Sequence, residues 1–83
     1  MEQQDPRLGR LRWQSRRGMK ELDTLFETFF NNGGLSNCSE ETIRDFERLL
    51  DCQDTDLLDW LLGRSTPQDA QLKHVVTLVR GSA

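Results

Sequence analysis

The chain has 83 residues, of which 30% are charged and 35% are hydrophobic, and its formal net charge is −3. This length suits a single domain over residues 1–83, with 1–5 and 81–83 as flexible termini, and the composition excludes a low-complexity or collagen-like chain. No apolar run approaches the ~18–20 residues of a membrane span, and no secretory signal follows the N-terminus, so we expect no direct membrane insertion.

Hydrophobic residues recur at helical spacing almost throughout, which predicts an all-α fold, a compact five-helix bundle. The first helix is expected over residues 6–16. Asp5 would be its cap and Pro6 would occupy its first position. Leu8 and Leu11 are three residues apart and share one face of this helix.

The opposite face of the first helix is basic. Residues 1–20 hold six cations against two carboxylates, a balance of +4, whereas residues 21–83 balance to −7. Arg10, Trp13 and Arg17 are spaced by three and four, so we expect them on this outer face. Tryptophan and arginine are over-represented in binding hot spots. The alternative interpretation is that Trp13 folds back onto the bundle and that the arginines only decorate the surface.

The second helix is expected from Met19 to Asn31, with Gly33 and Gly34 ending it in a left-handed conformation. Six large apolar residues form one continuous stripe along it at ~100° per residue. These residues are Met19, Leu22, Leu25, Phe26, Phe29 and Phe30.

Helix-start signals also place the third and fifth helices. Ser39 is a good N-cap for the third, whose first turn is acidic. The fifth is expected to open at Thr66 as its cap, with Pro67 at the first helical position and Asp69 two residues later. Gly81 would end it.

The fourth helix is expected over residues 55–62, capped by Asp54 and ended by Gly63. It is apolar nearly all round, so it should be buried on more than one side, Leu62 included. Large aromatic side chains should dominate the core, since each contributes about 1.5–3 kcal/mol when buried. This predicted core set is Phe26, Phe29, Phe30, Phe46 and Trp60.

The candidate catalytic and metal-binding residues lie far apart in the sequence. His74 has no partner in sequence and is expected at the edge of an apolar stripe. Cys52 reads as a small buried hydrophobe and Cys38 as a free surface thiol. Structural zinc normally needs four ligands, and no glycine-rich phosphate loop is present. We therefore expect neither a metal site nor an enzyme.

The stretch SRRGMKELD joins the first two helices. Gly18 would allow the turn and act as N-cap, and Glu21 would reach back to the N-cap amide as half of a capping box. That local account leaves Arg16, Arg17 and Lys20 unexplained, because cations near a helix N-terminus are disfavoured by the dipole. Arginine suits bidentate contacts with carboxylates or phosphates, so we expect an outward docking surface for a partner.

Several of these residues also carry a resemblance. The run Arg17-Gly18-Met19-Lys20-Glu21 matches an R-G-x-x-E motif. Together with Trp13 before it, the stretch FERLLDCQDTDLLDWLLG and the Thr66-Pro67 pair, it resembles the small flavinylation factors of succinate dehydrogenase, called SdhE in bacteria and assembly factor 2 in mitochondria. The resemblance covers roughly residues 7–80. Thr55 departs from it, standing where relatives often have proline.

The resemblance implies a five-helix bundle that promotes covalent attachment of FAD to a histidine of a client. The client would be the flavoprotein subunit of succinate dehydrogenase or fumarate reductase. FAD would be held by that client, with no cofactor bound tightly by this chain. A monomer in the bacterial cytoplasm is expected. The motif places Arg17, Gly18 and Glu21 at the contact, and the expected neighbours are Arg10, Trp13, Arg16 and Asp23.

Three alternatives follow from the residues themselves. The chain could be a small protein–protein interaction module for another client. It could bind nucleic acid through the basic first helix, although the acidic remainder would repel a polyanion. It could carry FAD directly, although nothing in the sequence forms a dinucleotide site.

Overall fold

A computed structural model describes residues 6–36 and 38–81. Over these ranges the chain forms helices and connections without a strand, which confirms the predicted all-α five-helix bundle. The helices are α1 (Pro6–Gln14), α2 (Lys20–Asn31), α3 (Glu40–Leu50), α4 (Asp54–Leu61) and α5 (Ala70–Gly81).

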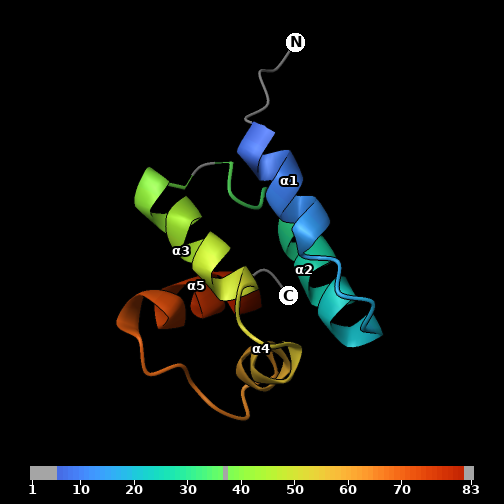
Figure 1. The fold of residues 1–83 in the computed structure, drawn as a ribbon, viewed down its shortest axis with the longest axis vertical. Coiled ribbons are helices and arrows are strands. Elements are labelled where there is room, and N and C mark those ends of the chain that lie inside the picture. The colour runs from blue at the N-terminus through green and yellow to red at the C-terminus, as the bar shows by residue number, and fades with distance from the viewer. Residues whose placement is uncertain (1–5, 37, 82–83) are drawn as a thin grey trace.

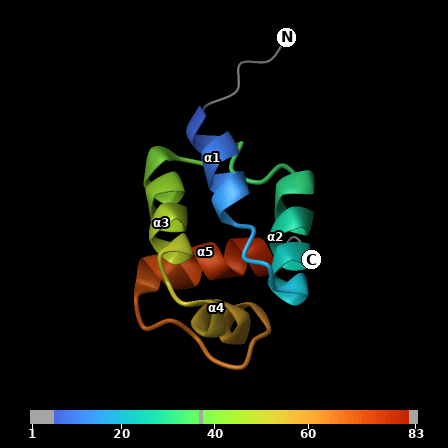
Figure 2. The same ribbon diagram turned by 45° about the vertical axis from the view of Figure 1, so that its right-hand side comes forward.

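The helices pack around α5. Figures 1 and 2 show α5 running across one end of α2 and α3, with α4 on its far side and α1 beside α2. Helix α5 contacts α2, α3 and α4, and α2 also contacts α4 and α1. The Cα radius of gyration is 12.0 Å, close to the ~12 Å expected of a compact chain of this length.

Local start and stop signals placed some helix ends correctly. Ser39 caps α3, its Oγ accepting a hydrogen bond from the Thr42 N–H at 3.2 Å. Gly33 and Gly34 end α2 with φ values of 108° and 52°, and the Gly34 N–H donates to the Phe29 carbonyl at 2.9 Å. Both patterns satisfy backbone groups that a helix end leaves unpaired.

Other predicted ends were wrong. Asp54 is the first residue of α4 and Gln53 holds its N-cap position. Helix α5 begins at Ala70, because Asp69 provides the cap that was assigned to Thr66: its Oδ1 accepts from the N–H groups of Gln71 at 2.8 Å and Leu72 at 3.1 Å. A carboxylate that receives two backbone donors outcompetes an earlier threonine for this role.

The two ends of the chain were predicted to be tails outside the helices. Gly81 is the last residue of α5, so the helix extends to the first residue of the predicted C-terminal tail. Residues 1–5, with the proposed cap Asp5, and residues 82–83 lie outside the described ranges. Helix α1 ends at Gln14, two residues before its predicted end, and the Ser15 hydroxyl donates to the Arg12 carbonyl at 2.7 Å.

The core is built on three phenylalanines. Phe26, Phe29 and Phe46 are buried, and the Phe46 ring centroid lies 5.9 Å from that of Phe26 and 5.7 Å from that of Phe29. Phe30 and Trp60 are only partly buried, so their predicted membership of the central core was wrong. Both pack against the core from its periphery, and the Phe30 ring centroid lies 5.7 Å from that of Phe46.

One further core prediction was wrong, and one core residue was missed, at sites where helical periodicity carries no information. Leu62 is 39% exposed, because it follows the last residue of α4 and turns away from the bundle. Leu35 lies in the connection between α2 and α3, yet it is 2% exposed. A connection has no repeating spacing, so the sequence did not mark Leu35 as part of the core.

Arg48 fastens α3 to the start of α5. Its Nη2 lies 2.7 Å from Asp69 Oδ2, and its Nη1 donates to Gln71 Oε1 at 3.1 Å. The hydrogen bond from Arg48, followed by the backbone hydrogen bond from Leu72, lowers the pKa of Asp69 below its ordinary value of 3.8. The folded state therefore prefers the ionised carboxylate.

This contact predicts an acid-sensitive contribution to stability. A carboxyl group whose pKa is lower in the folded than in the unfolded chain stabilises fully above the unfolded value and loses that effect as pH falls through the folded one. Thermal unfolding below about pH 4 should therefore depend less steeply on pH in Asp69→Asn than in the wild type. Asp56→Asn, which removes an exposed carboxylate without this arginine contact, should keep the wild-type slope. Equal slopes for Asp69→Asn and the wild type would contradict the prediction.

Candidate functional site

The connection between α1 and α2 turns at Gly18. Its φ is +80°, a left-handed value that L-residues with a side chain rarely adopt. Gly18 does not cap α2 as predicted, because Met19, in an extended conformation, holds the N-cap position. Gly18 is exposed, and a Cβ atom built on it would meet no atom within 4 Å. Nothing in the described parts of this chain therefore crowds that position.

Asp23, and not Glu21, ties the connection to α2. Asp23 Oδ1 accepts the Arg17 N–H at 2.8 Å. With Met19 as N-cap, Glu21 falls at the second helical position and not at the third, so the predicted capping box does not form. Glu21 is exposed. Its carboxylate is left available on the surface beside Gly18.

Arg17 has local partners that the sequence did not reveal. Its Nη2 donates to the Leu50 carbonyl and its Nε lies 3.5 Å from Asp54 Oδ1, while the side chain is only 20% exposed. Because α1 ends at Gln14, the helical spacing that placed Arg17 on the outer face with Trp13 no longer applies there. The expectation that Arg17 has no local role was therefore wrong.

Two of the arginines of α1, Arg7 and Arg10, face carboxylates of α3. The two terminal guanidinium nitrogens of Arg7, Nη1 and Nη2, each donate to a Glu40 carboxylate oxygen at 2.7 Å. Arg10 Nη2 lies 3.8 Å from Glu47 Oε2, with its own side chain 59% exposed. The positive charge of α1 is thus partly balanced within the fold. Exposed pairs of this kind contribute little stability, about 0–1 kcal/mol each.

Trp13 lies on the outside of the molecule. It is 71% exposed, as the outer-face interpretation predicted for this residue, and it does not fold back onto the bundle. A large aromatic side chain left in water is uncommon, and such residues are often anchors in protein interfaces. Arg16, three residues later, is exposed as well.

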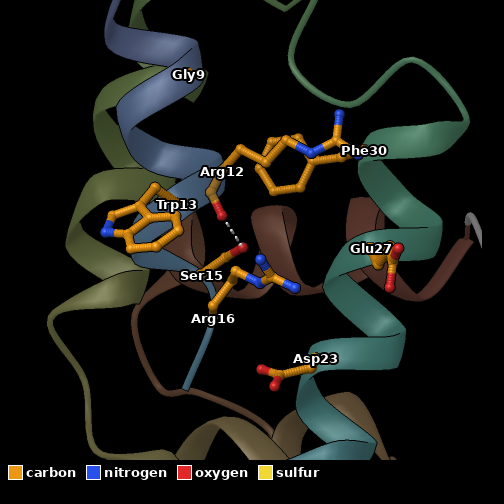
Figure 3. Close-up of a pocket in the computed structure, with 8 residues that line it drawn as sticks. All are labelled: Gly9, Arg12, Trp13, Ser15, Arg16, Asp23, Glu27 and Phe30. Carbon is orange, nitrogen blue, oxygen red and sulfur yellow. Dashed lines mark hydrogen bonds between the residues drawn. The ribbon is translucent and has the colours of Figure 1, made fainter. Parts of the chain in front are cut away.

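A pocket of about 280 Å³ opens between α1 and α2, next to Trp13. Figure 3 shows Arg12 and Arg16 reaching from the α1 side toward α2, with Asp23 and Glu27 along the opposite wall. The guanidinium carbon of Arg12 lies 5.6 Å from the centre of the Phe30 ring. The lining residues are Gly9, Arg12, Trp13, Ser15, Arg16, Asp23, Glu27 and Phe30.

The pocket brings together predicted and unpredicted residues. Trp13, Arg16 and Asp23 were candidates, whereas Arg12 and Glu27 were missed. A signal existed for Glu27, which follows Asp23 by four residues within α2, a spacing that places both on one side of the helix. Arg16 lies beyond the last residue of α1, so helical spacing does not connect it with Arg12.

The two thiols are half-buried and unpaired with each other. Cys38 packs against the core, so its predicted placement as a surface thiol was wrong. Burial raises the pKa of both the Cys38 and the Cys52 thiol above the ordinary value of 9.0, which keeps them protonated near neutral pH. His74 is exposed on α5. Across residues 6–36 and 38–81, no three His, Cys, Asp or Glu side chains are grouped as metal ligands would be.

None of the helices seen in these ranges is long and apolar enough to cross a bilayer.

Comparison with known proteins gives consistent matches over most of the chain. The profile of one family, described as the flavinator of succinate dehydrogenase, matches residues 9–83. A FAD assembly factor SdhE from Serratia sp. is 42% identical over 71 residues, covering 86% of this chain and 80% of the relative. The protein of the same name from Shewanella oneidensis is 42% identical over 76 residues and 92% of each chain. That from Pseudomonas aeruginosa is 40% identical over 72 residues, 87% of this chain and 84% of the relative.

Proposed function

Because the chain belongs to the family described as the flavinator of succinate dehydrogenase, we propose that it is an FAD assembly factor. It binds the flavoprotein subunit of succinate dehydrogenase or fumarate reductase and promotes covalent attachment of FAD to that subunit. The resemblance first drawn from the R-G-x-x-E motif is confirmed by the family profile and by relatives about 40% identical over most of the chain.

The client docks on the surface around Gly18, which we call the docking surface. The observation that carries this proposal is the pairing of an open backbone position at Gly18 with a 71% exposed Trp13. A bare backbone allows close approach, and the indole offers a large apolar anchor. The docking surface comprises Arg10, Trp13, Arg16, Arg17, Gly18, Glu21 and Asp23.

The helper needs no catalytic group of its own, so we propose that it is not an enzyme. The flavin held by the client supplies the electrophile and a client histidine supplies the nucleophile. Binding at the docking surface raises the population of the client conformation in which the two meet. Correct placement of reacting groups is worth up to ~7–11 kcal/mol of barrier. FAD stays with the client throughout.

We further propose that the chain acts as a monomer in the bacterial cytoplasm and does not bind nucleic acid. Two features support the last point. Arg7 and Arg10 are paired with glutamates of α3, and the formal net charge is −3. Both weaken the field that would attract a polyanion. A different protein client is the remaining alternative, and the experiment below distinguishes it.

The test uses the apo-flavoprotein subunit of succinate dehydrogenase incubated with FAD, with and without this protein. The client is then denatured, and its covalent flavin is measured by fluorescence in the gel. We expect severalfold more covalent flavin when the protein is present, because the reactive geometry is populated more often. Equal flavin in both samples would reject the proposed client. A protein that purifies with yellow colour of its own would contradict the proposal that FAD stays with the client.

A further inference from the structure

Arg17 connects three parts of the molecule that are distant in sequence. Its backbone N–H donates to Asp23 at 2.8 Å, which fixes the connection to α2. Its guanidinium donates from Nη2 to the Leu50 carbonyl at the end of α3 and lies 3.5 Å from the Asp54 carboxylate at the start of α4. One residue thus joins the α1–α2 connection to the junction between α3 and α4.

The chemistry of that junction suits arginine in particular. The last carbonyls of a helix lack intrahelical donors and carry the negative end of its dipole, and Leu50 is the last residue of α3. A planar guanidinium can reach such a carbonyl and a carboxylate at the same time, which a single ammonium cannot do in the same geometry. Nε is buried and contacts Asp54 as an ion pair only, with no hydrogen-bond acceptor among the described residues.

The neighbouring cations behave differently. Arg16 and Lys20 are exposed, whereas the Arg17 side chain is 20% exposed and held from within. A guanidinium that is mostly buried, and that already contacts a carbonyl and a carboxylate of its own chain, presents little surface to a partner. The backbone that follows it, at Gly18, is by contrast open to close approach.

We propose that Arg17 is a positioning residue. It holds the α1–α2 connection in the conformation that presents Gly18 to the client, and it does not bind the client through its charge. This inference rests on the proposed function, because it assigns a role to one residue of the docking surface.

The test compares Arg17→Lys, Arg17→Ala and Asp54→Asn. The first readout is the hydrogen-exchange rate of the residue 17 amide in the free protein, which is monitored by NMR. This amide should exchange faster in all three variants than in the wild type. For the two Arg17 variants the increase should be about tenfold or more, because that is the factor that one charge-assisted hydrogen bond contributes. The second readout is the Kd for the apo-flavoprotein subunit, which should rise in all three.

Arg17→Lys and Asp54→Asn distinguish a positioning role from a direct charge contact with the client. Arg17→Lys keeps the positive charge but not the contacts with both Leu50 and Asp54, so it should lose nearly as much client affinity as Arg17→Ala. Asp54→Asn keeps Arg17 but removes the carboxylate that it pairs with. Client binding should therefore weaken if Arg17 acts by positioning the connection, and should not weaken if Arg17 contacts the client through its charge. If circular dichroism shows that Arg17→Ala is unfolded, the client affinity of Asp54→Asn still tests the inference. Arg16→Lys is the control for exchange, and Lys73→Ala, on α5, is the control for client affinity.

Wild-type affinity in Arg17→Lys, or unchanged or tighter binding in Asp54→Asn, would overturn the inference in favour of a direct charge contact. Unchanged exchange of the residue 17 amide in Arg17→Ala would also overturn it. Failure of the proposed function looks different: the wild-type protein itself would then fail to raise covalent flavin in the client. The exchange data on the free protein would still decide whether Arg17 holds the connection.

Discussion

Gly18→Leu is expected to abolish most flavin attachment while leaving the protein folded. A side chain at this position would stand where the client backbone is to pack, and overpacking of a close contact costs about 1–3 kcal/mol or more, a loss of roughly 5–150-fold in affinity. Within this chain the new side chain meets no atom near its Cβ, so the helical circular dichroism signal should be retained. The measurements are client Kd and covalent flavin in the denatured client.

Gly33→Leu is the matched control for this experiment. Gly33 also has a left-handed φ, 108°, and open space around its Cβ, but it lies at the other end of α2. Both variants carry a similar backbone cost, about 1–2 kcal/mol for a side chain in a left-handed conformation. A Gly18→Leu protein that is folded and fully active, or a Gly33→Leu protein that is equally inactive, would reject Gly18 as a contact point.

Phe46→Ala is expected to lower the free energy of unfolding by about 3–5 kcal/mol. Phe46 is fully buried, with 0% exposure, and three other phenylalanine rings lie within 5.9 Å of it, centre to centre. Removing the ring leaves a cavity that the packed helices cannot fill by relaxing. A domain of this size is stable by only about 4–12 kcal/mol, so the variant should lose a large share of its total stability.

Urea denaturation followed by circular dichroism measures this loss directly. Leu62→Ala is the control, because Leu62 is 39% exposed and its truncation should cost about 1 kcal/mol or less. The two variants should separate clearly in midpoint while sharing the wild-type slope against urea. A Phe46→Ala protein destabilised no more than Leu62→Ala would show that the ring cluster is not the centre of the core.

The exposure of the proposed docking surface was partly predictable from the sequence. An R-G-x-x-E run beside a tryptophan and a basic helix was enough to select Trp13, Arg16 and Gly18, all of which are exposed in the fold. The internal role of Arg17 was not visible, because Leu50 and Asp54 lie more than thirty residues away along the chain. No local pattern records which carbonyl a distant guanidinium will reach.

By itself, the sequence determined where the helices form and which face of each is apolar. Those properties depend on spacing within a few residues, as in the stripe of α2 and the cap at Ser39. Tertiary structure alone decided which competing cap forms, that Leu35 joins the core, and that a pocket opens between α1 and α2. These outcomes depend on how separate helices meet, and the free-energy differences among alternative caps and contacts are small enough for packing to choose between them.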